Sequence, residues 1–133
     1  MTQYRDGLPQ LSGELYLTDA GLETDLIFNH GIEIREFAAH TLLQDEQGRE
    51  ALKSYLEGFL ALADEQNTGF ILDTQTWKAH VHWAGALGAT ESELREANEE
   101  AVRFVAKIRD KGSARNKLDN LGPKCAPYWV APD

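Results

Sequence analysis

The fold is decided by the stretch LKSYLEGFLALADEQNTGFILDTQT, residues 52–76. It predicts an amphipathic helix over about Asp45 to Gln66, because apolar side chains recur there at the helical period. The apolar stripe consists of Leu52, Tyr55, Leu56, Phe59, Leu60 and Ala63. Residues 67–69 (Asn-Thr-Gly) end this helix. Residues 70–72 (Phe-Ile-Leu) then form a short, fully apolar run, which is typical of a buried strand in a parallel sheet.

The same alternation of strand and helix extends outward from this stretch. Upstream, residues 15–18 predict a strand that stops at a turn over residues 19–21, and a short helix begins near Leu26. Downstream, Thr90 and Glu93 have the spacing of a capping box, and the helix they begin runs to about Asp110. The order strand, helix, strand, helix predicts βαβ units and therefore an α/β fold with a parallel sheet.

The length of 133 residues fits one domain. We expect an N-terminal extension over residues 1–13 and an irregular tail over residues 112–133, within which residues 117–121 occupy the position of a third strand. Residues 74–88 are expected to form a loop with one helical turn near residues 79–83. A complete (β/α)₈ barrel takes about 250 residues, so a barrel would be present here as roughly its first three βα units.

Charge and composition exclude several classes of function. Thirteen Lys and Arg against 22 Asp and Glu give a net charge of −9, which repels a phosphate backbone and argues against nucleic-acid binding. No apolar run approaches the ~18 residues of a membrane span. The single cysteine, Cys125, cannot form an internal disulfide, and residues 1–7 lack the apolar core of a signal peptide. These features predict a cytoplasmic protein.

Two segments follow the predicted strands directly, where α/β proteins carry their functional residues. In the first, Asp19 can accept hydrogen bonds from a substrate ammonium group, or it can simply close the strand end in an Asx turn. In the second, Thr74 and Thr76 share one face if the chain is extended. Their hydroxyls then serve either a ligand or ordinary loop hydrogen bonds. Trp77 beside them is either packing or a pocket wall.

Histidine and cysteine offer weaker candidates. His80 and His82 form a His-x-His pair, which can supply two metal ligands, but no further convergent ligand is evident. A metal-dependent hydrolase using this pair is therefore the least favoured hypothesis. Cys125 has no neighbouring Cys or His in the sequence to activate its thiol.

Taken together, the two strand-end segments resemble the homocysteine S-methyltransferase family. That family opens with a strand running into an Asp-Gly-Gly-like turn followed by Thr and Leu, similar to residues 17–26 here. Its second strand runs into a Thr-x-Thr-aromatic-x-Ala stretch, which is similar to residues 73–79 here. Residues 85–88 (Gly-Ala-Leu-Gly), before the next helix, are also similar to the family pattern. Gly122-Pro123 and Tyr128 are similar to a Gly-Pro and a downstream Tyr that follow its third strand.

The resemblance implies the N-terminal portion of a (β/α)₈ barrel that transfers a methyl group to the thiol of homocysteine, giving methionine. It also implies zinc held by cysteine thiolates, which lowers the thiol pKa of homocysteine. The methyl donor varies across the family. Asp19 and the amides near it would hold the amino-acid end of homocysteine. The implied substrate-binding set is Asp19, Ala20, Gly21, Thr24, Thr74, Thr76 and Trp77.

This sequence departs from the family in its metal ligands. The family's zinc-binding cysteines come from a Gly-Gly-x-Cys-like strand end and a Cys-Cys pair, and neither occurs here. We therefore expect no catalytic zinc on this chain alone, and a truncated protein with little or no turnover. The alternative is a non-catalytic α/β module that forms a homo-oligomer or completes a barrel with a partner chain, because unpaired strand edges favour association.

Overall fold

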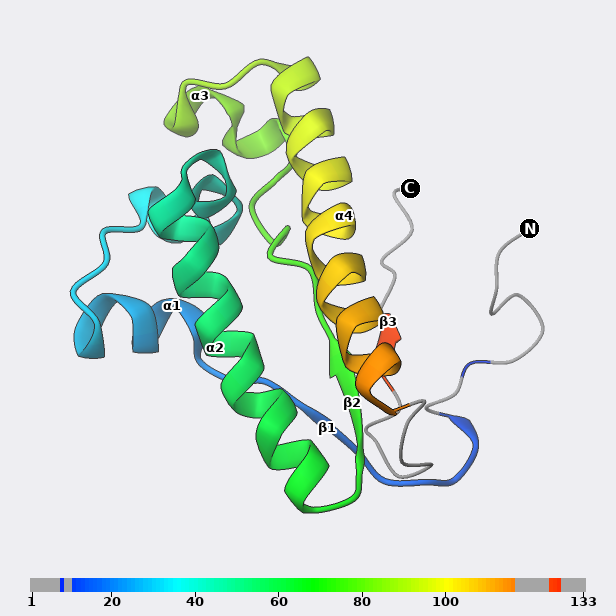
Figure 1. Ribbon diagram of the computed structural model, residues 1–133. Coiled ribbons are helices and arrows are strands. Elements are labelled where there is room, and N and C mark those ends of the chain that lie inside the picture. Colours follow the sequence, from blue (N-terminus) through cyan, green and yellow to red (C-terminus); the bar gives the residue numbers. More distant parts are fainter. Residues whose placement is uncertain (1–7, 9–10, 117–124, 128–133) are drawn as a thin grey trace.

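The computed structural model describes residue 8, residues 11–116 and residues 125–127 (Figure 1). Strands and helices alternate along the chain, as the sequence predicts. In chain order the elements are β1 (Tyr16–Thr18), α1 (Leu22–Thr24), η2 (Asp25–Asn29), η3 (Arg35–Phe37), η4 (Ala39–Gln44), α2 (Glu46–Glu65), β2 (Gly69–Leu72), η5 (Val81–Trp83), α3 (Ala84–Leu87), α4 (Glu91–Asn116) and β3 (Cys125–Pro127).

The three strands form one parallel sheet in the order β1-β2-β3. Leu17 lies opposite Phe70 in the first pair, and Phe70 lies opposite Cys125 in the second. Parallel neighbours need a crossover connection, which α2 supplies between β1 and β2 and α4 supplies between β2 and β3. The predicted α/β class with a parallel sheet is confirmed.

Helix α2 agrees closely with its prediction. Asp45 caps its first turn by accepting a hydrogen bond from the amide of Gly48 at 2.7 Å. The helix ends at Glu65, and Asn67 follows with a positive φ of 51°, a conformation that Asn tolerates better than most residues. Five members of the apolar stripe are buried and Phe59 is half-buried. The helical period therefore identified the buried face of α2 correctly.

Helix α4 begins as predicted and ends later than predicted. The Thr90 hydroxyl accepts from the amide of Glu93 at 3.2 Å, and the Glu93 carboxylate accepts from the amide of Thr90 at 2.7 Å, which completes the capping box. The helix runs on to Asn116, so the expected irregular tail from residue 112 is wrong over residues 112–116. A single glycine such as Gly112 costs a helix only about 1 kcal/mol, too little to end it.

The third strand also differs from expectation. The predicted position at residues 117–121 lies outside the described residues, as do Gly122-Pro123 and Tyr128. The described strand is Cys125–Pro127, which lies wholly within the expected irregular tail, so that expectation is wrong there too. Helix α4 contacts β3, as a crossover helix packs on the strand it leads into.

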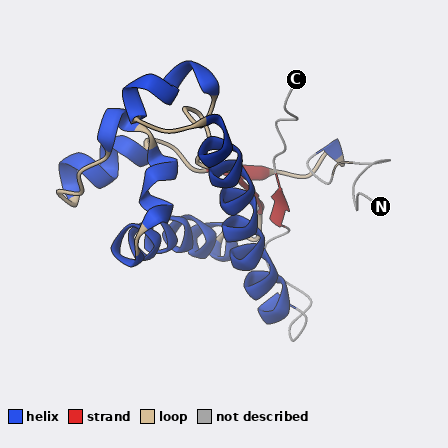
Figure 2. Cartoon of the chain, turned by 90° about the horizontal axis from the view of Figure 1, so that it is seen from above, coloured by secondary structure: helices blue, strands red, loops and turns tan. Residues whose placement is uncertain are grey.

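The hydrophobic core lies between the sheet and the two long helices, which pack on the same side of it (Figure 2). Phe70, Leu72, Leu52 and Leu56 are its largest fully buried side chains. An ion pair between Arg49 of α2 and Glu100 of α4, at 2.7 Å, joins the two helices outside the core. No helix of the described chain is long and apolar enough to cross a membrane.

Candidate functional site at the strand ends

Two carboxylates follow the carboxyl ends of the neighbouring strands β1 and β2. Thr18 pairs with Ile71, so Asp19 and Asp73 both follow the paired ends of their strands. Burial raises the pKa of Asp19 above its usual value. Burial also raises the pKa of Asp73, and the negative charge of Asp19 adds to that shift. Two carboxylates of like charge oppose each other's ionisation, and Asp73 is the more exposed of the two.

Tyr55 reaches this edge of the sheet from α2. Its hydroxyl donates to the carbonyl of Ala20 at 2.8 Å, and its burial together with the charge of Asp19 raises its pKa far above normal. The nearby Tyr55 hydroxyl partly offsets the rise in the pKa of Asp19. Sequence reasoning assigned Tyr55 only to the apolar stripe of α2. The available signal was a hydroxyl within a stripe otherwise made of Leu, Phe and Ala, since a buried Tyr usually finds a polar partner.

The first predicted segment forms a tight turn into α1. Gly21 has φ 71° and ψ 32°, the left-handed conformation that glycine adopts without strain. Its carbonyl accepts from the amide of Asp25 at 2.8 Å, and the Ala20 carbonyl is occupied by Tyr55. Thr24 ends α1 and is exposed. The turn therefore brings Asp19, Ala20 and Gly21 to the strand end, with Thr24 farther along the chain on the surface.

In the second segment the two threonines meet, for a reason that differs from the prediction. Their hydroxyl oxygens are 3.0 Å apart. The chain is not extended here: the amide of Thr76 donates to the carbonyl of Thr74 at 2.8 Å, and this turn brings the side chains together. Gln75 is buried between them and donates to the carbonyl of Asp73 at 2.9 Å. We define Asp19, Tyr55, Asp73, Thr74 and Thr76 as the strand-end site.

Trp77 lies outside the core, with 71% of its surface exposed. The neighbouring Lys78 is buried instead, and its ammonium lies 3.9 Å from the ring centroid of Trp83 and 5.0 Å from that of Trp77. Attraction between a cation and aromatic faces stabilises such an arrangement by about 0.5–2 kcal/mol. The sequence did not predict this role for Lys78, because Trp83 reaches it only through the turn formed by η5.

A turn with strained backbone at Glu36 and Phe37 also contacts Lys78. Glu36 and Phe37 have positive φ angles of 52° and 57°, which are uncommon for residues other than glycine. The carbonyl of Glu36 accepts from the Lys78 ammonium, and Arg35 donates to the carbonyl of Ala86 at 3.0 Å. These two hydrogen bonds connect residues 34–38 to the loop that follows β2, at Lys78, and to helix α3, at Ala86.

The two histidines of the His-x-His pair lie next to each other on the surface. The rings of His80 and His82 stack with centroids 6.1 Å apart, and both residues are exposed. Among the described residues, no group of three or more His, Cys, Asp or Glu is placed to hold a metal ion. The side chain of Cys125 lies outside what the structure describes.

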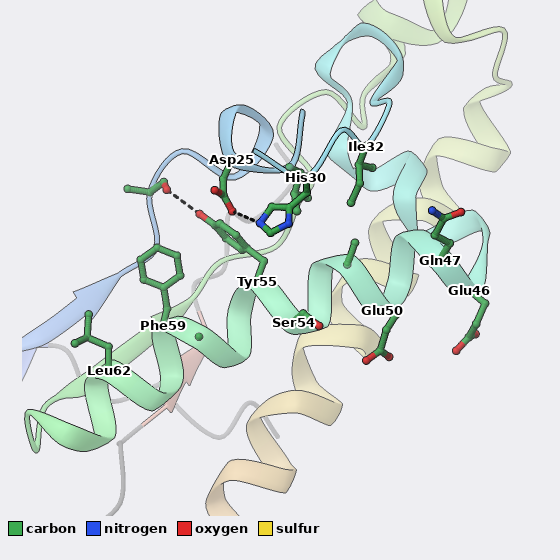
Figure 3. Close-up of a pocket in the computed structure, with 14 residues that line it drawn as sticks. Asp25, His30, Ile32, Glu46, Gln47, Glu50, Ser54, Tyr55, Phe59 and Leu62 are labelled. Atoms are coloured by element: carbon green, nitrogen blue, oxygen red, sulfur yellow. Dashed lines mark hydrogen bonds and ion pairs between the residues drawn. The ribbon is translucent and has the colours of Figure 1, made fainter. Parts of the chain in front are cut away.

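A separate groove of about 1040 Å³ lies on the outer side of α2, between that helix and η2 (Figure 3). Of the residues predicted to bind substrate, Ala20 alone lines it. Tyr55 contributes to both places, since its ring lies in the groove while its hydroxyl reaches Ala20.

Comparison with known proteins gives no relative. No protein-family model matches the chain, and no curated protein or solved structure is significantly similar to it.

The raised pKa of Asp19 has a measurable consequence for stability. A carboxyl whose pKa is raised on folding favours the native state when protonated, and that contribution is lost as pH rises through the raised pKa. Asp19→Asn, which stays neutral, is therefore expected to be more stable than the wild type at pH 7. The difference should close below the ordinary Asp pKa of 3.8. Urea unfolding followed by circular dichroism at pH 7 and pH 3 measures it, and an Asn variant that is less stable at pH 7 contradicts it.

Proposed function

We propose that the strand-end site binds the amino-acid end of homocysteine and that the chain is part of a homocysteine S-methyltransferase-like (β/α)₈ barrel. The observation that supports the proposal is that Asp19 and the Thr74–Thr76 hydroxyl pair follow the carboxyl ends of two neighbouring parallel strands, β1 and β2. These are the residues on which the family resemblance rests. The consecutive order β1-β2-β3, with both long helices on one side, supports the barrel because barrels progress in this way.

The chemistry of the site suits an α-amino acid. Asp19 and Asp73 offer carboxylates to the ammonium group, and the threonine hydroxyls can donate to a carboxylate or accept from an ammonium. Burial of Asp19 strengthens any interaction with a cation, because screening by water is reduced there. An ionised group kept partly buried at a cost in stability is typical of a functional site.

The donor set does not fit the zinc ion that the family resemblance implies. The strand-end site offers carboxylate and hydroxyl oxygens. Zinc sites are instead built mainly from cysteine sulfur and histidine nitrogen. The described residues contain no group placed to hold a metal. The proposal for this chain is therefore limited to recognition of the amino-acid end, and methyl transfer belongs to the proposed whole protein.

Calorimetric titration with L-homocysteine and with L-homoserine, which carries oxygen in place of sulfur, tests this proposal. Both ligands should bind with similar affinity, because the site recognises their common amino-acid end. Asp19→Asn should weaken both by about 10–100-fold, since a hydrogen bond to a charged group contributes about 1.5–3 kcal/mol.

Asp64→Asn is the matched control, because Asp64 is an exposed carboxylate in the last turn of α2, away from the strand-end site. It should leave both affinities unchanged. Absence of binding by the wild type at millimolar ligand, or equal binding by the Asp19 and Asp64 variants, would sink the proposal.

A second candidate function, a module that completes a barrel with another chain, is favoured by one specific observation. Of the described helices, the two long ones cover one face of the sheet, while Thr18 is exposed at the end of β1 and Leu15, just before it, is 67% exposed. Uncovered sheet surface favours association. Sedimentation velocity over a hundredfold range of concentration tests it, and a monomer throughout would contradict self-association.

A further inference from the structure

The groove of Figure 3 has the shape of a helix-binding surface. Its wall is one continuous face of α2 that extends from Glu46 to Leu62. At 1.5 Å per residue this face is about 24 Å long, the length of a helix of roughly 16 residues. The opposite wall comes from η2, His30 and Ile32. The apolar lining consists of Ala20, Leu26, Ile32, Ala51, Tyr55, Gly58, Phe59 and Leu62.

The groove occupies the flank of α2 that faces away from α4. Arg49 pairs with Glu100 on the α4 side, whereas η2 lies on the opposite side in Figure 1. Two apolar side chains remain open to solvent there: Leu62 at 46% within the groove and Phe28 at 74% on η2. Among the described residues, η2 therefore covers this flank of the helix only in part.

Gly58 lines the groove and leaves open space there. A Cβ placed on Gly58 would meet no atom within 4 Å, so nothing in this chain requires a glycine there. Glycine inside a helix costs about 1 kcal/mol relative to alanine. A missing side chain in an apolar groove lets another backbone approach closely, as helices do when they pack 8–10 Å apart.

Charge favours one kind of helix. The carboxylates of Asp25, Glu46 and Glu50 line the groove, and none of the described residues that line it is Lys or Arg. Asp25 pairs with His30, also in the lining, and Glu50 pairs with Lys53, each at 3.3 Å, so the carboxylates outnumber their basic partners. In Figure 3 the two glutamates lie together at one end of α2, and Phe59 and Leu62 lie at the other. A helix with an apolar stripe and basic residues at one end is complementary to this pattern. A second copy of this chain, at a net charge of −9, is not.

We propose that this groove docks an amphipathic helix of a partner protein, with an apolar stripe along α2 and lysine or arginine over Glu46 and Glu50. The mode of recognition is a helix in a groove, anchored by apolar side chains at i, i+3, i+4 and i+7. Tyr55 is common to the groove and the strand-end site, and the peptide titrations below test the groove without any strand-end ligand.

A pair of synthetic 18-residue helical peptides provides the probe. Both carry leucines at i, i+4, i+7 and i+11 on alanine, and one has three lysines in its last turns where its twin has three glutamates. Titration into the full chain in 50 mM salt should show micromolar binding of the lysine peptide, at least tenfold tighter than its twin. In 500 mM salt the gap should narrow, because screening weakens exposed charge pairs.

Two variants locate the binding. Gly58→Leu should fill the groove and weaken the lysine peptide at least tenfold, and the open space around Gly58 keeps the fold intact. Gly112→Leu in α4 is the matched control, since a Cβ there also meets nothing, and it should bind like the wild type. Combined Glu46→Lys and Glu50→Lys should reverse the preference between the peptides.

Three results would overturn the proposal. They are equal binding of the two peptides by the wild type, equal binding of the lysine peptide by Gly58→Leu and Gly112→Leu, and a wild-type dimer that Gly58→Leu dissociates. The last result would assign the groove to a second copy of the chain. Circular dichroism of each variant verifies that its helices are formed.

Discussion

Replacing Phe70 by alanine is expected to lower the free energy of unfolding by about 3–5 kcal/mol, the usual cost of emptying a buried aromatic site. Phe70 is completely buried at the centre of β2, where it pairs with both neighbouring strands. Its ring lies 6.2 Å from that of Phe59 on α2, so the sheet and the helix both lose a packing partner. Small domains are stable by only about 5–15 kcal/mol, so a large part of the total is removed.

Urea unfolding followed by circular dichroism measures this loss. Leu62→Ala is the control, because Leu62 lies on the same helix as Phe59 but is 46% exposed, and its truncation should cost well under half as much. If Phe70→Ala were no more damaging than Leu62→Ala, the core would not be centred on β2.

Alanine at Gly48 is expected to destabilise the fold by about 1–3 kcal/mol, whereas alanine at Gly58 should stabilise it by about 0.5–1 kcal/mol. Both glycines lie in α2. A Cβ on Gly48 would overlap the backbone of Leu42, and backbone cannot rotate away as a side chain can. A Cβ on Gly58 meets open space and gains helix propensity without a clash.

The two variants serve as controls for each other, because the substitution and the helix are the same. Their unfolding midpoints in urea should move in opposite directions from the wild type, with unchanged slopes. If both midpoints rose, the contact between α2 and η4 at Gly48 would be loose enough to admit a methyl group. The result would then contradict the packing at Leu42.

The long elements could be predicted because their signals are local. The stripe from Leu52 to Ala63 repeats at the helical period, and residues 70–72 are apolar throughout, so α2 and β2 follow from neighbouring residues alone. The capping box at Thr90 and Glu93 is equally local. The end of α4 was predicted too early, because the basic residues near Asp110 and Gly112 resemble a helix C-terminus. They do not stop the helix, which continues to Asn116.

Parts of the candidate site depend on contacts that no local pattern encodes. Asp19 was selected because it follows a strand, and its charge contributes to the raised pKa of Asp73 at the end of the neighbouring strand. Tyr55 joins the same site from a helix far along the chain, which only the folded packing shows. The sequence also does not distinguish Gly48 from Gly58. In the structure, the backbone of Leu42 leaves no room for a side chain at Gly48, whereas Gly58 has open space around it.

The position of Lys78 gives the protein an optical consequence. Two of the three tryptophans, Trp77 and Trp83, lie against the Lys78 ammonium, and the third, Trp129, is outside the described residues. A positive charge near an indole ring shifts the energy of its excited state. The tryptophan emission of this chain therefore reports on the segment from Trp77 to Trp83, and its wavelength should shift when the Lys78 ammonium leaves the two rings.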